Sequence, residues 1–367
     1  MIDPIFNMFK VRFEYLDTMK ILKEDTEKVI VYINFEQVLK VLLNPKTNNA
    51  LKGLNKHNEI KLQLMSNIVN LAMHYRLYFC KLGKDCRVVM YYNYPKGRYN
   101  NVSYIPNYKS VIYFKLFSDL NTGYIGRCME EIQTFLTSLM AYMNEVYLIK
   151  SPCVESSLIP FILKEHVYTD DIQTTQHIIV SNSHYEYSYI DKGFTIISPN
   201  GKDSLYLTED NVIDEMKRLA KIKSKDIIPT QFIPYAISLL GDKYRGITKM
   251  GGIGLGGIIK MINTSLDKCI ITPNSTSVEL LSETIDEKYR EQFINNYKCT
   301  SLDFQYSEVT DMQLEDILNQ IVDKFDDNAL VRINQKYFNR FPLMTINMKS
   351  SQVLDKSKLR HLRSMFG

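Results

Sequence analysis

The stretch from Ile228 to Ile262 reads IPTQFIPYAISLLGDKYRGITKMGGIGLGGIIKMI. Two apolar runs with helical spacing, 230–240 and 257–263, enclose a glycine-rich segment over 241–257. Glycines allow a tight backbone turn, and the N-terminal amides of the following helix can then face a phosphate. The triplet Gly252-Ile253-Gly254 taken alone is equally typical of a plain turn between two helices, so the residues around it decide the interpretation.

Ten residues of this stretch follow a spaced pattern without a gap: Pro229, Gln231, Gly241, Asp242, Ile247, Gly252, Ile253, Gly254, Lys260 and Ile262. The pattern resembles the helix–three-turn–helix element of flap endonucleases and phage-type 5′-to-3′ exonucleases. Within this superfamily the chain is similar to the RNase H of large tailed phages, whose C-terminal part the segment 297–320 resembles. The resemblance implies a PIN-like α/β fold and a turn that contacts duplex DNA, often with a K⁺ ion held by backbone carbonyls.

The chain before this stretch alternates between strand and helix patterns. Uninterrupted β-branched and aromatic runs are typical of strands buried on both faces, and they occur at 29–33, 87–92, 177–180 and 194–197. Helical spacing of apolar residues occurs at 60–79, 128–148, 155–163 and 209–222. This order predicts an α/β fold with a parallel central sheet flanked by helices, followed by a mainly helical C-terminal part.

Four regions follow from these patterns. We expect an N-terminal extension over 1–27, a nuclease-like α/β domain over 28–225 with an arch-like insertion at about 94–127, a helix–three-turn–helix and helical domain over 226–346, and a basic tail over 347–367. The tail ends in LRSMFG, which resembles the short apolar peptides that bind sliding clamps. A helix packed on its own domain is the alternative interpretation.

The resemblance also identifies eight positions at which relatives carry acids around two divalent metal ions. In this chain they are Asn34, Asn93, Glu155, Ser157, Leu158, Ser183, Tyr185 and Arg245, and only Glu155 is an acid. Mg²⁺ requires oxygen ligands, preferably anionic ones, and the two metals activate water and stabilise the leaving oxygen. Arginine stays charged and repels a nearby cation. The sequence therefore predicts a catalytically degenerate relative with no catalytic residue and no bound Mg²⁺.

Several alternatives stay open at this point. Glu36 and Glu186 lie close to lost positions, so an active metal-dependent nuclease with relocated acids is the second hypothesis. Asp170 and Asp171 precede a strand and are expected at the opposite edge of the sheet. Arg245 either contacts a phosphate or forms an ion pair with Glu155. A structural or assembly role of the fold in a phage particle is the third hypothesis.

Candidate DNA contacts fall into two groups. Residues 94–127 lie where relatives thread a single strand, and they mix cations with tyrosines as sequence-independent binding requires: Lys96, Arg98, Tyr99, Tyr104, Tyr108, Lys109, Tyr113, Lys115 and Arg127. A chain with 25 tyrosines and no tryptophan can also place tyrosines in such a loop by composition alone. The second group is expected on the duplex backbone and comprises Gly252, Gly254, Gly256, Lys249, Lys260 and Arg245.

Composition limits the remaining classes. The 367 residues are 45% hydrophobic, and 45 basic against 41 acidic side chains give a net charge of +4, which does not by itself indicate nucleic-acid binding. No apolar run approaches the roughly 20 residues of a bilayer-spanning helix. The six cysteines form no C-x-x-C pair, so a zinc site is not expected. We expect a protein of the host-cell cytoplasm or the virion, with DNA as its partner and phage replication, transcription or particle proteins as further partners.

Overall fold

The computed structural model describes residues 21–35, 71–93, 100–108, 146–151, 153–169, 173–199, 204–243, 245–274 and 277–321. Some predicted features lie outside these residues. They are most of the N-terminal extension and of the arch-like insertion, the N-terminal parts of the helices expected at 60–79 and 128–148, and the basic tail. The rest of the predicted α/β part and most of the helical part can be compared with the structure.

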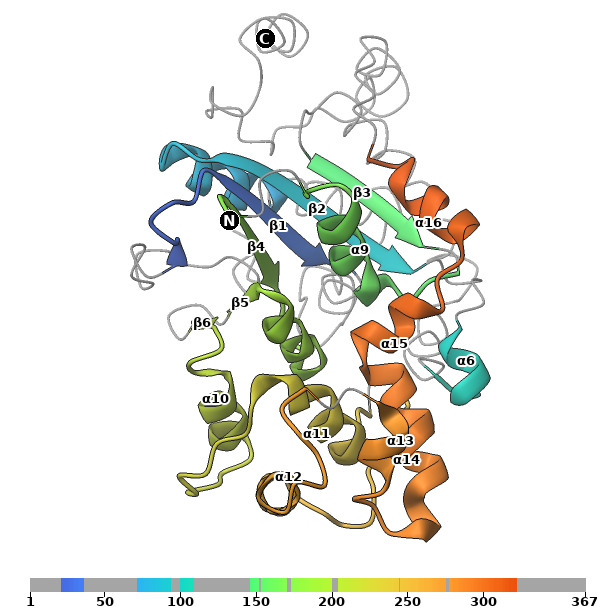
Figure 1. The fold of residues 1–367 in the computed structure, drawn as a ribbon. Helices are drawn as coiled ribbons and strands as arrows, with labels where there is room; N and C mark the ends of the chain where they lie inside the picture. The colour runs from blue at the N-terminus through green and yellow to red at the C-terminus, as the bar shows by residue number, and fades with distance from the viewer. Residues whose placement is uncertain are drawn as a thin grey trace, which may run out of the picture.

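A six-stranded sheet with the strand order β3-β2-β1-β4-β5-β6 forms the centre of the molecule (Figure 1). Five strands are parallel: β1 Lys28–Asn34, β2 Asp85–Asn93, β3 Val146–Ser151, β4 Thr175–Val180 and β5 Phe194–Ser198. The short β6, Leu205–Leu207, pairs antiparallel with β5 at one edge. Every residue of β1 after Lys28 is buried, as the uninterrupted apolar run predicts. The α/β prediction is confirmed, and the sheet is mixed at its edge.

Strand β3 corrects one prediction. The helical spacing over 128–148 includes Val146, yet residues 146–151 form a strand that pairs with β2, with Val146 opposite Val88. Val146, Tyr147 and Ile149 are β-branched or aromatic, and short apolar runs of this kind fit a buried strand as well as a helix. The pairing with β2 decides between the two, and the spacing along the sequence could not show it.

The helices of the described residues surround the sheet and extend beyond it (Figure 1). Their bounds are α6 Asn101–Tyr104, η2 Ser156–Leu158, α9 Ile159–His166, η3 His184–Lys192, α10 Val212–Leu219, η5 Thr230–Phe232, α11 Ile233–Leu240, α12 Leu255–Asp267, α13 Val278–Ser282, α14 Glu287–Thr300, α15 Leu302–Ser307 and α16 Asp311–Leu318, with residues 71–81 also helical. None of the described helices is long and apolar enough to cross a membrane. Helices α11 to α14 form the helical part, and the arrowheads of β1, β2 and β4 point toward it.

The sheet and the helical part share one hydrophobic core. It runs from Tyr32 in β1 through Leu239 in α11 to Ile258 in α12 and Phe293 in α14. The predicted boundary near residue 225 falls in the exposed segment between α10 and α11. The site between the two parts is therefore held by a continuous apolar framework.

Strand β4 contains a buried histidine, His177. The Tyr32 hydroxyl lies 3.0 Å from His177 Nδ1, and both residues are buried. Burial, with smaller contributions from the charges of Lys164 and Lys23, lowers the pKa of His177 from 6.5 to about 3. His177 is therefore neutral in the folded protein at pH values where an unfolded histidine takes up a proton.

This histidine should make the protein sensitive to acid. Because the unfolded chain binds the extra proton, stability is lost as pH falls from 6.5 toward 3, and the histidine contributes a loss of about 2 kcal/mol between pH 7 and pH 5. In His177→Phe this part of the pH dependence should disappear, whatever the absolute stability of the variant. Urea unfolding of both proteins at the two pH values measures it, and equal slopes with pH would contradict the assignment.

Candidate functional site

Three strand ends define the crevice in which a ligand is expected. Because β1 lies between β2 and β4, the chain leaves β1 toward one edge of the sheet and later returns to fill the other. In open α/β sheets, ligands bind at the carboxyl ends of the strands beside such a reversal. Asn34 ends β1, Asn93 ends β2, and residues 181–183 follow β4. The structure thus brings together three of the positions at which relatives carry acids.

Asn34 is hydrogen-bonded to Glu186, an acid next to Tyr185, which is one of the eight positions at which the resemblance implies an acid. Its side-chain amide donates to Glu186 Oε1 at 3.0 Å, and the Tyr91 hydroxyl donates to the same oxygen at 3.4 Å. Glu186 is fully buried in η3, a 3₁₀ helix that the sequence did not predict. One of the two candidate relocated acids is therefore at the site and held by neutral donors, while Glu36 lies outside the described residues.

Asn93 holds the loop that leads into η2. Its amide donates to the Val154 carbonyl at 2.7 Å, and its Oδ1 accepts from the Ser156 amide at 2.9 Å. The loop buries Glu155, whose Oε1 accepts from the Ser157 hydroxyl at 3.1 Å. Leu158, the next of the eight positions, packs into the hydrophobic core. These residues fix the position of Glu155, the one acid retained among the eight positions. The neighbouring positions supply a hydroxyl and an apolar side chain and no second carboxylate.

Arg245 is among the largest fully buried side chains of the described residues. Its Nη1 lies 3.0 Å from Asp242 Oδ2 and 3.3 Å from Ser183 Oγ, and its guanidinium carbon lies 3.6 Å from the centre of the Tyr185 ring. Tyr185 is anchored in turn, since its hydroxyl donates to the Cys299 carbonyl at 2.9 Å and accepts from Gln305 at 2.8 Å. A cation–π stack and a charge-assisted hydrogen bond fix the arginine in place.

The electrostatics around Arg245 favour its charge. Burial disfavours a charged guanidinium, but the charge of Asp242, helped by that of Glu155, outweighs burial and holds the pKa of Arg245 well above its ordinary value. Burial raises the pKa of Tyr185 and of Tyr108 at the same site. The site therefore contains a permanent internal cation.

Two expectations for Arg245 change accordingly. The ion pair that the structure shows is with Asp242, three residues earlier in the same turn, whereas the expected partner was Glu155. The side chain is also turned inward over Tyr185 and is completely enclosed, so it does not present its guanidinium to a phosphate from solvent. The ion pair could have been predicted from the sequence, because Asp242 and Arg245 are only three residues apart within one turn.

Residues 100–108 cover the crevice. The φ of Gly246 is +75°, and a Cβ built there would lie 2.8 Å from the Asn107 carbonyl oxygen, so the two backbones touch beside Arg245. Tyr108 is buried next to Ile247 and Cys299. This backbone contact needs a glycine, and it places residues 107–108 beside the turn that carries Arg245.

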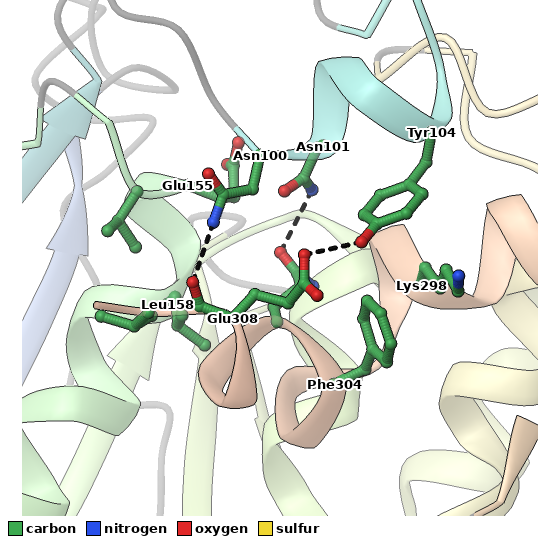
Figure 2. Close-up of a pocket in the computed structure, with 11 residues that line it drawn as sticks. Asn100, Asn101, Tyr104, Glu155, Leu158, Lys298, Phe304 and Glu308 are labelled. Carbon is green, nitrogen blue, oxygen red and sulfur yellow. Dashed lines mark hydrogen bonds between the residues drawn. The ribbon is translucent and has the colours of Figure 1, made fainter. Parts of the chain in front are cut away.

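The same segment is fastened to the C-terminal helices, as Figure 2 shows. Asn101 donates to Gln305 Oε1 at 3.2 Å, and the Tyr104 hydroxyl donates to Glu308 Oε2 at 2.6 Å. The Tyr104 ring packs on Phe304, with Lys298 above it. Tyr104 and Tyr108, both expected in a base-stacking region, thus pack internally. The hollow between these elements has Glu155 and Leu158 in its wall.

The residues present do not suit a divalent metal. Among the described residues no group of three or more His, Cys, Asp or Glu side chains is placed to hold an ion. Glu155 and Glu186 are buried acids near these strand ends, and Asp242 is already paired with the buried guanidinium of Arg245. Mg²⁺ needs several oxygen ligands, and a fixed positive charge opposes its entry. No hydrolytic step through a metal follows from this site.

The glycine-rich turn lies between α11 and α12 and faces outward. Asp242 and Ile247 exchange backbone hydrogen bonds of 2.9 Å, and the Met250 amide donates to the Leu239 carbonyl at 2.9 Å, which fixes the ends of the turn. Gly254 is the N-cap of α12, with an extended backbone and no side chain bonded to the helix end. The first amides of a helix have no intrahelical partners. Lys249, Gly252, Gly254 and Lys260 are exposed, and Gly256 is half-buried.

The other predicted DNA contacts lie outside the described residues. These are Lys96, Arg98, Tyr99, Lys109 and Lys115. The structure therefore places together the residues of the glycine turn and α12 that are predicted to contact duplex DNA. The contacts of the arch-like insertion remain predictions.

Comparison with solved structures points to one group of proteins. A bacteriophage T5 flap endonuclease described as a pseudo-enzyme–product complex with DNA and metal ions is 13% identical and has a TM-score of 0.49, with 83% of this chain and 98% of that chain covered. A bacteriophage T5 5′-exonuclease with bound zinc is 11% identical and also has a TM-score of 0.49, with 82% and 100% covered. The chain is similar in structure to phage 5′-exonucleases. No protein-family model and no curated protein sequence matches the chain.

Sequence reasoning missed the residues that anchor Tyr185. Cys299 and Gln305 lie 114 and 120 residues further along the chain, in α14 and α15. A carbonyl and an amide that meet a tyrosine across such a separation leave no local pattern. The inward orientation of Tyr185, and with it the stack on Arg245, could only come from the folded structure.

Proposed function

We propose that this protein binds the duplex part of branched or partly single-stranded DNA through the turn between α11 and α12, and does not hydrolyse it. The observation that carries the proposal is the buried Arg245, which is ion-paired with Asp242 and stacked on Tyr185 at the strand ends. A fixed cation stands where the resemblance expects a carboxylate beside two metals. In this proposal the glycine turn has the residues needed to bind DNA, while the strand ends lack the acids needed to hold two metal ions.

The absence of hydrolysis follows from charge and enclosure. Two-metal phosphodiester cleavage needs a site that attracts cations and admits both a phosphate and a water molecule. Glu155 and Arg245 are buried, and residues 107–108 pack over the turn that carries Arg245. The arginine supplies internally the positive charge that metals supply in relatives, so the retained acid needs no divalent ion as its counter-charge.

DNA binding is supported by the outward face of the turn. Exposed amides at the start of α12 and the exposed Lys249 and Lys260 are groups that bind phosphates without reading sequence. The ten-residue pattern of this stretch resembles an element that contacts duplex DNA in relatives. A K⁺ ion held by carbonyls of the same turn is part of the proposal.

Glu186 favours a second candidate function. It is a buried acid in η3 that is hydrogen-bonded to Asn34 at the end of β1, so with Glu155 it provides two carboxylates near the crevice for an active metal-dependent 5′-to-3′ exonuclease. Against this, one oxygen of Glu186 already accepts from both Asn34 and Tyr91. The degenerate binding protein is therefore the better supported of the two.

The metal dependence of binding tests the proposal. Fluorescence anisotropy with a labelled flap DNA should give the same Kd in EDTA and in Mg²⁺ at matched ionic strength, because phosphate contact by amides and lysines needs no divalent ion. The Kd should rise steeply with salt, as expected when counterions are released from DNA. Binding that appears only with Mg²⁺ would contradict the proposal and favour a functional metal site.

A further inference from the structure

A lysine-rich segment that precedes the pattern of residues 228–262 lies beside the start of α12. It follows α10 and reads Lys221-Ile222-Lys223-Ser224-Lys225. All three lysines are exposed, and Ile222 between the first two is half-buried. The segment, called here the lysine loop, carries three positive charges and is followed by one acid, Asp226.

The backbone of the lysine loop is fixed at its start. The amides of Lys221 and Ile222 donate to the carbonyls of Arg218 and Lys217 at 3.1 and 2.9 Å, which closes the end of α10. Lys221 has a positive φ of 56°, the left-handed conformation common after a helix end. The chain therefore leaves α10 in a defined direction toward α12 (Figure 1).

Ile222 places the loop against the first turn of α12. A Cβ built on Gly256 would lie 3.6 Å from Ile222 Cδ1, so the isoleucine packs directly over this glycine. Gly256 and Lys260 are four residues apart and therefore share one face of the helix. The lysine loop, the start of α12 and Lys260 thus form one continuous surface next to Gly254.

The charges of this surface are not neutralised within the described part of the chain. The ion pairs there include none of Lys221, Lys223, Lys225, Lys249 and Lys260. By contrast, Lys217 and Arg218 in the preceding helix pair with Asp214 and Glu215. Unpaired lysines around exposed helix amides are suited to a polyanion, whose phosphates release counterions when lysines bind them.

We infer that the lysine loop is a second DNA contact, which binds backbone phosphates of the same duplex arm next to those bound by the glycine turn. This inference rests on the proposed DNA binding and adds to it a specific group of residues and a specific part of the substrate. The partner is duplex backbone, because lysines recognise the charge of phosphates and not the bases, and the loop Lys221-Ile222-Lys223-Ser224-Lys225 contains no aromatic residue that could stack on a base.

The test compares two triple variants with the same loss of charge. Lys221→Asn/Lys223→Gln/Lys225→Gln removes the loop charges, with asparagine chosen because it tolerates the left-handed backbone at residue 221. Lys23→Gln/Lys81→Gln/Lys84→Gln removes three lysines near the amino ends of β1 and β2, at the other edge of the sheet. Equal thermal unfolding temperatures of both variants and the wild type confirm that the fold is kept.

The readout is the slope of log Kd against log salt for a plain duplex. Each lost phosphate contact lowers that slope by about 0.9, so the loss of three contacts should lower the slope of the loop variant by about 2.7, and this variant should bind about 10-fold or more weakly at 0.1 M salt. The control variant should keep nearly the wild-type slope. The lysine loop alone is overturned if the loop variant has the same slope and Kd as the control variant. This conclusion requires that the wild type still binds the duplex and that a glycine-turn variant does not. A wild type that binds no DNA overturns both the loop and the proposed function.

Discussion

Replacing Arg245 by methionine is expected to lower the free energy of unfolding by about 3–5 kcal/mol, the cost of removing one partner of a buried ion pair. The variant leaves Asp242 beside an apolar side chain and removes the cation stacked 3.6 Å above Tyr185. It also removes a positive charge that interacts electrostatically with the buried Glu155. Urea unfolding at pH 7 measures the loss.

Two matched variants separate charge from packing. Arg245→Met/Asp242→Asn should recover part of the loss, since the second change removes the negative charge that the guanidinium balances in the wild type. Arg245→Lys keeps the charge but not the planar group that stacks on Tyr185, so we expect a loss intermediate between wild type and Arg245→Met. An Arg245→Met variant as stable as the wild type would show that the buried pair is not the organising feature of the site.

The second large effect is expected for a substitution of Gly254 that weakens duplex binding without lowering the stability of the fold. Gly254→Asp should weaken duplex binding about 100-fold, because a carboxylate facing a phosphate costs several kcal/mol and about 2.7 kcal/mol corresponds to that factor. The backbone of Gly254 is extended, with φ −93° and ψ 168°, and nothing lies within 4 Å of a Cβ at this position. The residue is an N-cap, so aspartate should leave α12 unchanged or stabilise it by a few tenths of a kcal/mol.

Gly254→Asn is the control for this variant. Asparagine has nearly the same shape and caps a helix equally well, but it carries no charge. We expect it to bind duplex DNA within a few fold of the wild type, as measured by anisotropy in the same buffer. Equal weakening by both residues would mean that bulk rather than charge blocks the turn, and no weakening by either would remove the turn from the binding surface.

The fold could be predicted to a large extent because its strands are buried on both faces. A strand such as β1 must be apolar along its whole length, so the pattern survives in the sequence of Val29 to Ile33. The helices around the glycine turn could be predicted from their spacing. Strand β3 could not, since Val146 also continues a helical spacing and only its partner Val88 in β2 decides its conformation.

The candidate site could be predicted in its composition but not in its organisation. The missing acids and the glycine pattern are visible in the order of residues. The inward position of Arg245 depends on Tyr185, and Tyr185 depends on the carbonyl of Cys299, which lies in a different part of the chain. The cover formed by residues 100–108 depends likewise on Gln305 and Glu308. Contacts between such distant residues have no periodicity to be found.

One experiment tests the central claim, that this protein holds DNA at a nuclease-like fold without cutting it. A 5′-labelled flap DNA is incubated with the protein in Mg²⁺ or Mn²⁺, and bound and cleaved fractions are measured in the same samples. We expect a shifted complex with salt-dependent affinity and intact DNA in both metals. Metal-dependent cleavage that is abolished by Glu155→Ala would contradict it.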